Sequence, residues 1–274
     1  MSNASVYPFG YTEEEERRLE WQAALLEDIS RDMFIRAGLG EGMRVLDLGC
    51  GVGDVSFLAA RLVGREGRVV GVDRSASSLV AARKRARAGG FDNIAFLEGD
   101  LTAFDPIESF DAVIGRFILL YLKDPAGVLL RLKRGVQPGG IVAFQEIDYS
   151  VVAQVPSSEL FERVLKWILG ALEAGAADPN ISAKFSGTFL GAGLPRPDII
   201  ASTPAEGGPV SPYYEFITQM VRSMLPLIEK AGIATAEEID VATLTDRLRN
   251  DAVTGERLLF PPRVVNAWTR LPAA

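Results

Sequence analysis

The chain of 274 residues contains no histidine and a single cysteine, Cys50. Without histidine, the Ser-His-Asp and Cys-His nucleophile systems, a histidine general base and most zinc sites are excluded. One cysteine cannot form an internal disulfide bond, which is typical of proteins from a reducing cytoplasm. We therefore expect a cytoplasmic protein without a metal site. Any general base must come from Asp, Glu, Tyr, Lys or water.

Long apolar runs and an excess of positive charge are also lacking. No segment approaches ~20 consecutive apolar residues, and the acidic run at 13–16 does not resemble a signal peptide. The net charge is −7, whereas nucleic-acid-binding proteins usually carry a basic face. The basic run at 83–87 is either such a face or, as its helical spacing favours, a solvent-exposed helix surface. We therefore expect a small-molecule substrate, no nucleic-acid partner and no membrane span.

Strand-like and helix-like segments alternate along the first half of the chain. Strands are expected at 43–48, 68–73, 94–98, 110–115 and 141–147, and two more follow at 198–202 and 263–271. Helices are expected at 55–63, 76–88 and 125–134, after an amphipathic helix at 13–37. Several strands are continuous apolar runs, as in sheets covered on both faces. The pattern predicts an α/β fold with a doubly wound, Rossmann-like, seven-stranded and mostly parallel sheet.

The second half is mostly helical. Helices are expected at 156–174, at 181–190, from 212 to a kink or break at Pro226, and from the capping box of Thr235 and Glu238 to about 253. An apolar stripe at Phe216, Met220 and Met224 is predicted to be helix core or, in part, a substrate wall. The helical insertion at 203–262 is predicted to be either a substrate lid or an element for packing or dimerisation. The sequence leaves open whether the chain forms a homo-oligomer.

These segments predict three parts of the chain. Residues 1–41 form an N-terminal helical segment, and residues 42–155 form a cofactor-binding core. Residues 156–274 complete the sheet and carry the helical insertion.

The most informative segment is the sequence DLGCGVGD at 47–54. Gly49, Gly51 and Gly53 allow a sharp turn and the close approach of a ligand, and the helix that follows directs free N–H groups at that ligand. A dinucleotide fingerprint needs a third glycine where this chain has Asp54, whose charge would repel a pyrophosphate. The turn therefore favours a cationic cofactor without phosphate, and an NAD-type oxidoreductase is a less favoured alternative.

Acidic residues follow three successive strands. Asp73 ends the second strand, where it can accept hydrogen bonds from both ribose hydroxyls. Asp100 follows the third strand, where it can accept from an adenine amine while the next backbone amide meets a ring nitrogen. A single acid is more often a helix cap or a turn residue, but acids at Asp47, Asp73 and Asp100 together predict an adenosine-containing cofactor.

Together these motifs resemble the class I S-adenosylmethionine-dependent methyltransferases. The resemblance covers residues 43–148 and is carried by VLDLGCGVGD, VVGVDRS, FLEGDL, FDAVIGRFILLYLKDP and LKRGVQPGGIVAFQE. The N-terminal helix and its lead-in YPFGY resemble the ubiquinone/menaquinone C-methyltransferase group. The resemblance implies S-adenosylmethionine as cofactor, S-adenosylhomocysteine as product, and C-, O- or N-methylation of a small hydrophobic acceptor. A non-methylating member of the same fold, pericyclase-like or regulatory, is the alternative.

The resemblance also implies a set of cofactor-binding residues. Asp47 would hold the methionine amino group, Asp73 the ribose hydroxyls and Asp100 the adenine. Arg116 would line the junction between cofactor and acceptor, and Tyr11 would close over the methionine end. The full set is Tyr11, Gln22, Asp47, Gly49, Gly51, Gly53, Asp73, Arg74, Asp100, Leu101, Arg116 and Phe117.

Three residues beyond the fourth and fifth strands are candidates to position or deprotonate the acceptor, namely Tyr121, Glu146 and Tyr149. A sulfonium methyl group is already activated, so alignment of the acceptor supplies much of the catalysis. A base is needed only where the acceptor does not ionise by itself. Glu146 is equally well interpreted as a buried structural carboxylate bonded to backbone amides.

Overall fold

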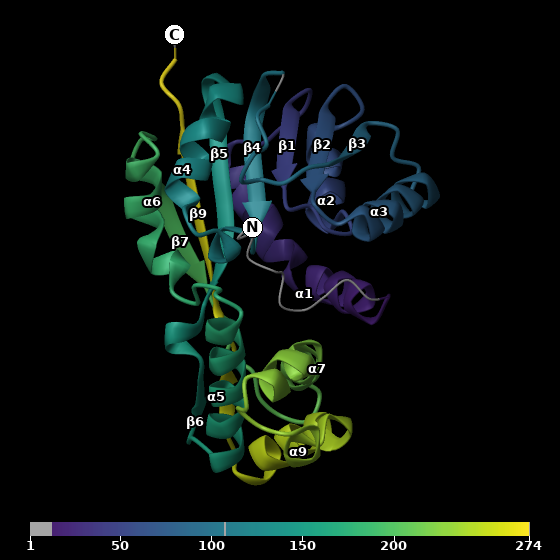
Figure 1. The fold of residues 1–274 in the computed structure, drawn as a ribbon, viewed down its shortest axis with the longest axis vertical. Helices are drawn as coiled ribbons and strands as arrows, with labels where there is room; N and C mark the ends of the chain where they lie inside the picture. The colour runs from purple at the N-terminus through teal and green to yellow at the C-terminus, as the bar shows by residue number, and fades with distance from the viewer. Residues whose placement is uncertain (1–12, 107, 274) are drawn as a thin grey trace. The chain divides into compact units, whose positions relative to one another are not determined.

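The computed structural model describes residues 13–106 and 108–273, which form two compact units (Figure 1). The sheet unit comprises 13–146, 182–200 and 265–273, and the helical unit comprises 147–181 and 201–264. The helical unit thus contains the insertion predicted at 203–262 together with the segment that directly follows the fifth strand. Its function as a substrate lid stays a prediction.

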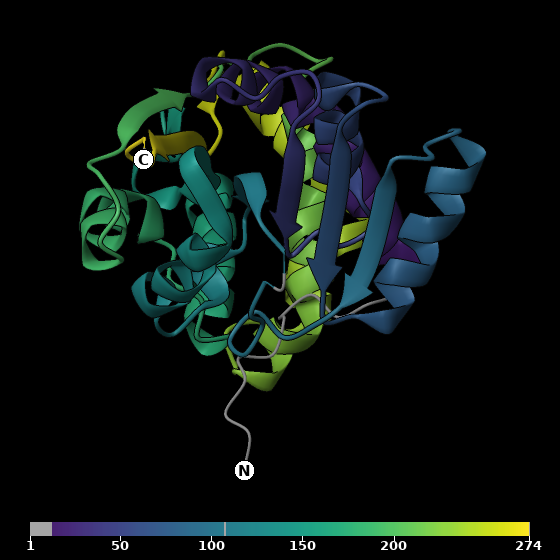
Figure 2. The same ribbon diagram turned by 90° about the horizontal axis from the view of Figure 1, so that it is seen from above.

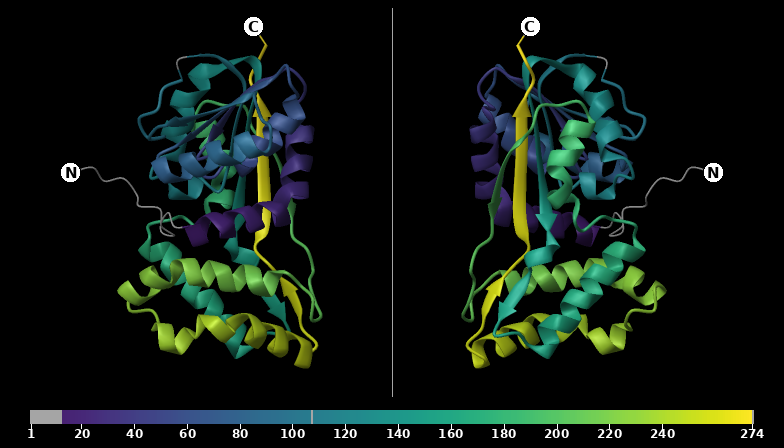
Figure 3. Two further views of the ribbon diagram at one scale, coloured as in Figure 1. Left: turned by 90° about the vertical axis from the view of Figure 1, so that its right-hand side faces the viewer. Right: turned by 90° about the vertical axis from the view of Figure 1, so that its left-hand side faces the viewer.

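The sheet unit is built on a seven-stranded sheet of order β3-β2-β1-β4-β5-β9-β7. Its strands are β1 (Arg44–Leu48), β2 (Arg68–Asp73), β3 (Ile94–Glu98), β4 (Phe110–Arg116), β5 (Val136–Asp148), β7 (Asp198–Ser202) and β9 (Arg263–Arg270). Neighbouring strands from β3 to β5 are parallel, whereas β9 runs opposite to β5 (Figure 3). The predicted mostly parallel, doubly wound sheet is confirmed. The strand order reverses between β1 and β4, and ligands of such sheets bind at the carboxyl ends of these strands.

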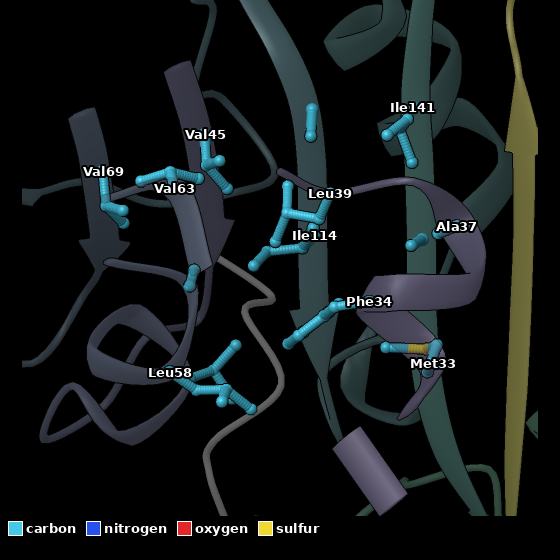
Figure 4. Close-up of a cluster of buried hydrophobic side chains, with 14 of the residues drawn as sticks. Met33, Phe34, Ala37, Leu39, Val45, Leu58, Val63, Val69, Ile114 and Ile141 are labelled. Carbon is cyan, nitrogen blue, oxygen red and sulfur yellow. The ribbon is translucent and has the colours of Figure 1, made fainter. Parts of the chain in front are cut away.

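Helices cover both faces of this sheet (Figure 2). They are α1 (Glu13–Ala37), α2 (Asp54–Val63), α3 (Ala76–Ala88), α4 (Pro125–Leu132) and α6 (Phe185–Gly191), with 3-10 turns η1 (Leu119–Tyr121), η2 (Lys133–Gly135) and η4 (Ile181–Lys184). Phe34 of α1 and Leu58 of α2 share one buried cluster with Ile114 of β4 (Figure 4). Ala143 of β5 belongs to this cluster. Side chains alternate between the two faces of a strand, so the next residue, Phe144, points to the opposite face of the sheet. There its ring packs edge to face against Phe189 of α6, with 6.4 Å between the ring centroids.

The helical unit packs α7 (Tyr213–Lys230) against α5 (Glu159–Ala174) and α9 (Val241–Thr254). The predicted capping box of Thr235 and Glu238 is confirmed at the start of α8 (Ala236–Ile239). Three short elements complete the unit: η3 (Tyr149–Val151), β6 (Ala153–Val155) and its antiparallel partner β8 (Leu258–Phe260). In the described part of the chain, no helix combines the length and the apolar character needed to cross a bilayer.

Of the kink or break predicted at Pro226, the break is wrong, because α7 continues through this proline to Lys230; the kink stays a prediction. Phe216, Met220 and Met224 are buried in the interior of the helical unit, as the helix-core interpretation of this stripe predicts. Met224 before Pro226 and Ile228 after it are both buried, so packing on both sides of the proline holds the helix together despite the lost backbone hydrogen bond.

Candidate cofactor site

The glycine turn between β1 and α2 has the backbone geometry of a ligand cradle. Gly49, Gly51 and Gly53 have φ angles of 65°, 53° and 94°, a left-handed region that favours glycine. A Cβ at Gly49 would lie 2.6 Å from the side chain of Ile118. A Cβ at Gly51 would meet no atom of the described residues within 4 Å and would project into open space between them. Gly49 is thus required for packing, and Gly51 leaves room for a ligand.

Asp47 lies at this turn with one carboxylate oxygen unused. The side chain is buried, and its Oδ2 accepts a hydrogen bond of 2.6 Å from Ser56 Oγ on α2. Its Oδ1 is buried and has no hydrogen-bond partner among residues 13–106 and 108–273. Burial raises the pKa of Asp47 to about 7. A buried acceptor without a partner is costly, and an ammonium group of a ligand would provide one.

Asp73 ties the turn to the following helix. Its Oδ2 accepts from the Gly51 amide at 2.9 Å, and its Oδ1 accepts from the Ser75 amide at 2.8 Å. A carboxylate has about four lone-pair positions, so both oxygens can still accept bonds from ribose hydroxyls. The neighbouring Arg74 is exposed.

Asp100 closes the turn after β3. Its Oδ1 accepts from the backbone amide and the hydroxyl of Thr102, both at 2.8 Å, and these bonds hold the pKa of Asp100 below its usual value. Leu101 is buried, and its carbonyl oxygen accepts a bond of 2.7 Å from Arg131 on α4. The loop beside the predicted adenine position is therefore firmly held.

Asp54 is paired, which the sequence did not reveal. Its Oδ1 lies 2.7 Å from Arg85 Nη2 on α3, and Arg85 Nη1 also donates to the Val52 carbonyl oxygen at 2.7 Å. Neutralisation by Arg85 weakens the predicted repulsion between Asp54 and a phosphate. Arg83, from the same basic run, donates to the Phe96 carbonyl oxygen at 2.8 Å, so these two basic residues hold the sheet unit together.

The loop after β4 is anchored by Glu146 of β5. Glu146 Oε1 accepts from the backbone amides of Ile118 and Leu119 at 3.0 Å and 2.6 Å. Its Oε2 is buried and finds no partner in the part of the chain that the structure describes, and burial raises the pKa of Glu146 to about 8. Phe117 precedes these amides with a left-handed φ of 55°, and the half-buried Tyr121 ends the turn. Glu146 therefore bonds to backbone amides, as expected for a buried structural carboxylate. Its role as a general base stays a prediction.

A buried polar chain involving Arg116 was missed by the sequence reasoning. Arg116 Nη1 donates to Ser30 Oγ at 3.2 Å, and Ser30 Oγ donates to Gln145 Oε1 at 2.7 Å. Gln145 Nε2 donates to Asn266 Oδ1 at 2.6 Å. The sequence did contain a signal for this network, because each of these residues is polar within an apolar segment. Ser30 lies on the apolar face of a helix, and Gln145 and Asn266 lie inside apolar strands.

Gln22 on α1 is buried, and its Oε1 accepts from Arg18 Nη1 at 2.7 Å. Tyr11 lies outside the described residues. Tyr149 belongs to the helical unit, whereas Tyr121 and Glu146 belong to the sheet unit.

Tyr149 lines a cavity of about 560 Å³ in the helical unit. Its hydroxyl donates to Met220 Sδ at 3.5 Å. The other lining residues are Ser150, Leu169, Glu173, Ala176, Ala177, Asp178, Pro179 and Asn180. This lining is more polar than the apolar wall expected for a hydrophobic acceptor. Among the described residues no group of three or more His, Cys, Asp or Glu side chains is placed to hold a metal ion.

Residues 39–178, 140 of the 274, match the family model of a methyltransferase domain. The chain belongs to this family. Aklanonic acid methyltransferase DauC from Streptomyces sp. strain C5 is 40% identical over 104 residues, which are 38% of this chain and 47% of DauC. The 2-phytyl-1,4-naphtoquinone methyltransferase from Thermosynechococcus vestitus is 35% identical over 133 residues, which are 48% of this chain and 55% of that enzyme. The chain spans about half the length of these curated relatives.

The fold also matches solved structures. The YcgJ protein from Bacillus subtilis superimposes with a TM-score of 0.57 and 15% identity, covering 90% of this chain and 100% of YcgJ. The predicted resemblance to small-molecule methyltransferases, including quinone methyltransferases, is thus confirmed at the level of the family.

Proposed function

We propose that this protein transfers a methyl group from S-adenosylmethionine to a small organic acceptor. The proposal is carried by two features at the switch point of the sheet, namely the cradle at Gly51 and the buried Oδ1 of Asp47, which has no partner among the described residues. Both features fit the amino-acid end of this cofactor. When bound, S-adenosylmethionine supplies a methyl group that its positively charged sulfur has already activated.

Different side chains of the sheet unit bind different parts of the cofactor. Asp47 Oδ1 accepts from the cofactor's ammonium group, and Asp73 accepts from the ribose hydroxyls with the lone pairs left by its two backbone bonds. Asp100 and the amide of Leu101 hold the adenine. Bonds between such charged groups and a ligand are each worth about 1.5–3 kcal/mol, enough to hold the donor in one orientation for transfer.

The acceptor is a small molecule, and we expect Tyr121 or Glu146 of the sheet unit, or Tyr149 of the helical unit, to position or deprotonate it. The cavity beside Tyr149 has the size of a small-molecule site. The two curated relatives are named for aklanonic acid and for a phytyl-naphthoquinone, so these compounds and their analogues are the first acceptors to test.

The test is incubation of the purified protein with S-adenosylmethionine and such a panel, followed by mass spectrometry. Methyl transfer predicts a product heavier by one CH₂ group and an equal amount of S-adenosylhomocysteine. Calorimetry that detects no binding of S-adenosylmethionine or S-adenosylhomocysteine would refute the proposal. Cofactor binding without a methylated product from a broad acceptor panel would favour the non-methylating alternative.

The affinity for S-adenosylhomocysteine should rise as the pH rises from about 5.5 to 7. Asp47 is protonated below its pKa of about 7, so binding of an ammonium group must release a proton. The Kd should therefore fall by up to about tenfold per pH unit in this window. Calorimetry in buffers of different ionisation enthalpy counts the released protons. Asp47→Asn should bind weakly and without the pH dependence, and a wild-type Kd that is constant over this window contradicts the assignment.

A further inference from the structure

The polar chain of Arg116, Ser30, Gln145 and Asn266 crosses the sheet unit beneath α1. It joins α1 to β4, β5 and β9 through consecutive bonds of 3.2, 2.7 and 2.6 Å. Every bond is donated in the same direction, away from the Arg116 guanidinium. Dipoles aligned in this way stabilise the positive charge of Arg116, the first donor of the series, and polarise one another.

The position of this chain is as informative as its bonds. Ser30, Gln145 and Asn266 are completely buried. On the α1 face, Ile114 and Ala143 belong to the apolar core, and the next residues of β4 and β5 on that face are Arg116 and Gln145, paired in register. Burial of polar groups costs free energy that hydrogen bonds only balance. The core therefore turns polar at the carboxyl edge of the sheet, where ligands of this fold bind.

Arg116 has donors to spare. A guanidinium has five N–H donors, and the described partners of Arg116 are Ser30 and the Phe117 ring, whose centroid lies 5.9 Å away. Arg116 is half-buried, and burial lowers the pKa of its guanidinium, whereas the nearby carboxylates of Asp54, Asp47 and Glu27 oppose this shift. Asp47 of β1 pairs in register with Ile114 of β4, and Ile114 and Arg116 lie on the same face of β4 because side chains alternate along a strand. A carboxylate and a guanidinium therefore lie near the carboxyl ends of neighbouring strands, on one face beside the glycine turn, which matches a ligand that carries both an ammonium and a carboxylate group.

We propose that Ser30, Gln145 and Asn266 are positioning residues that hold Arg116 ready to bind the carboxylate of the cofactor's amino-acid end. This inference rests on the proposed function, because it takes S-adenosylmethionine as the ligand. Arginine binds carboxylates through two parallel N–H bonds when its plane is fixed. Ser30 fixes one edge of that plane by accepting from Nη1 and leaves the opposite edge for the ligand.

The experiment compares two probes, S-adenosylhomocysteine and its decarboxylated analogue, which keeps the ammonium group, by calorimetry without acceptor. Arg116→Gln should lose about 10- to 100-fold in affinity for S-adenosylhomocysteine, and Ser30→Ala about 3- to 10-fold. Both should bind the decarboxylated analogue as the wild type does. Ser30→Thr, which keeps the hydroxyl, should restore the preference for the carboxylate. The matched control is Ser182→Ala, which changes a buried serine of the same unit whose hydroxyl bonds to none of the described residues. This variant should change neither affinity.

The outcomes separate the two proposals. If the wild type binds neither probe, the proposed function fails. If the wild type binds both, and Ser30→Ala and Arg116→Gln lose the two probes equally or lose neither, the positioning role is overturned. Thermal unfolding identifies a variant that is merely destabilised. If Ser30→Ala is such a variant, Asn266→Leu, which changes the last residue of the hydrogen-bonded series, is compared with the wild type on the same two probes. A selective loss for the carboxylate-bearing probe in either Ser30→Ala or Asn266→Leu supports the inference.

Discussion

Replacing Asp73 by alanine is expected to weaken the binding of S-adenosylhomocysteine by about 100-fold or more. The substitution removes the proposed acceptor for the ribose hydroxyls, and each bond to a charged group is worth about 1.5–3 kcal/mol. It also releases the amides of Gly51 and Ser75, which Asp73 now holds at 2.9 and 2.8 Å. The cradle would then lose both its ligand contact and its own support.

Calorimetry on three variants separates these two contributions. Asp73→Asn keeps the size of the side chain and one acceptor oxygen, so its affinity should lie between those of the wild type and Asp73→Ala. Asp92→Ala removes an exposed carboxylate elsewhere in the sheet unit and should have no effect. An affinity of Asp73→Ala equal to that of the wild type would show that the ribose assignment is wrong.

The elements that build this site could be predicted because their signals are local. The strands 68–73 and 94–98 are observed with the predicted bounds, since each is an apolar run that ends at a turn. The amphipathic helix at 13–37 and the glycine turn follow equally from nearby residues. Hydrophobic periodicity and turn chemistry suffice for such elements.

Features that depend on long-range pairing could not be predicted in the same way. β5 begins at Val136 rather than at 141 because its pairing with β4 shifts register between Phe110 and Ala112. The strands β6 and β8 have three residues each, too few for a periodic pattern. The pairing of Asp54 with Arg85 joins residues 31 positions apart, and a local argument about phosphate repulsion does not contain it.

Replacing Glu146 by alanine is expected to destabilise the folded state by about 2–5 kcal/mol. The buried amides of Ile118 and Leu119 would lose their acceptor, and the side chain would leave a cavity behind. Glu146→Gln keeps an oxygen acceptor and nearly the same volume, so it should retain most of the stability. Urea unfolding of both variants and the wild type measures the difference. Equal stability of Glu146→Ala and the wild type would show that this carboxyl does not anchor the loop.

The same carboxyl should make stability depend on pH. The pKa of Glu146 is raised from 4.5 to about 8 in the folded state, so the folded chain holds a proton that the unfolded chain releases. Its contribution is complete below pH 4.5 and is lost as the pH rises towards 8, by up to about 1.4 kcal/mol per pH unit. The pKa of Asp47, which is raised from 3.8 to about 7, acts in the same direction.

Unfolding free energies measured from pH 5 to 7 should therefore fall with rising pH in the wild type. They should fall less steeply in Glu146→Gln and in Asp47→Asn, and least in the double variant, because each amide removes one of the two titrations. An unchanged slope in Glu146→Gln would mean that this buried carboxyl is already ionised in the folded protein, and the unpartnered Oε2 would then need a positive partner that the described residues do not place beside it.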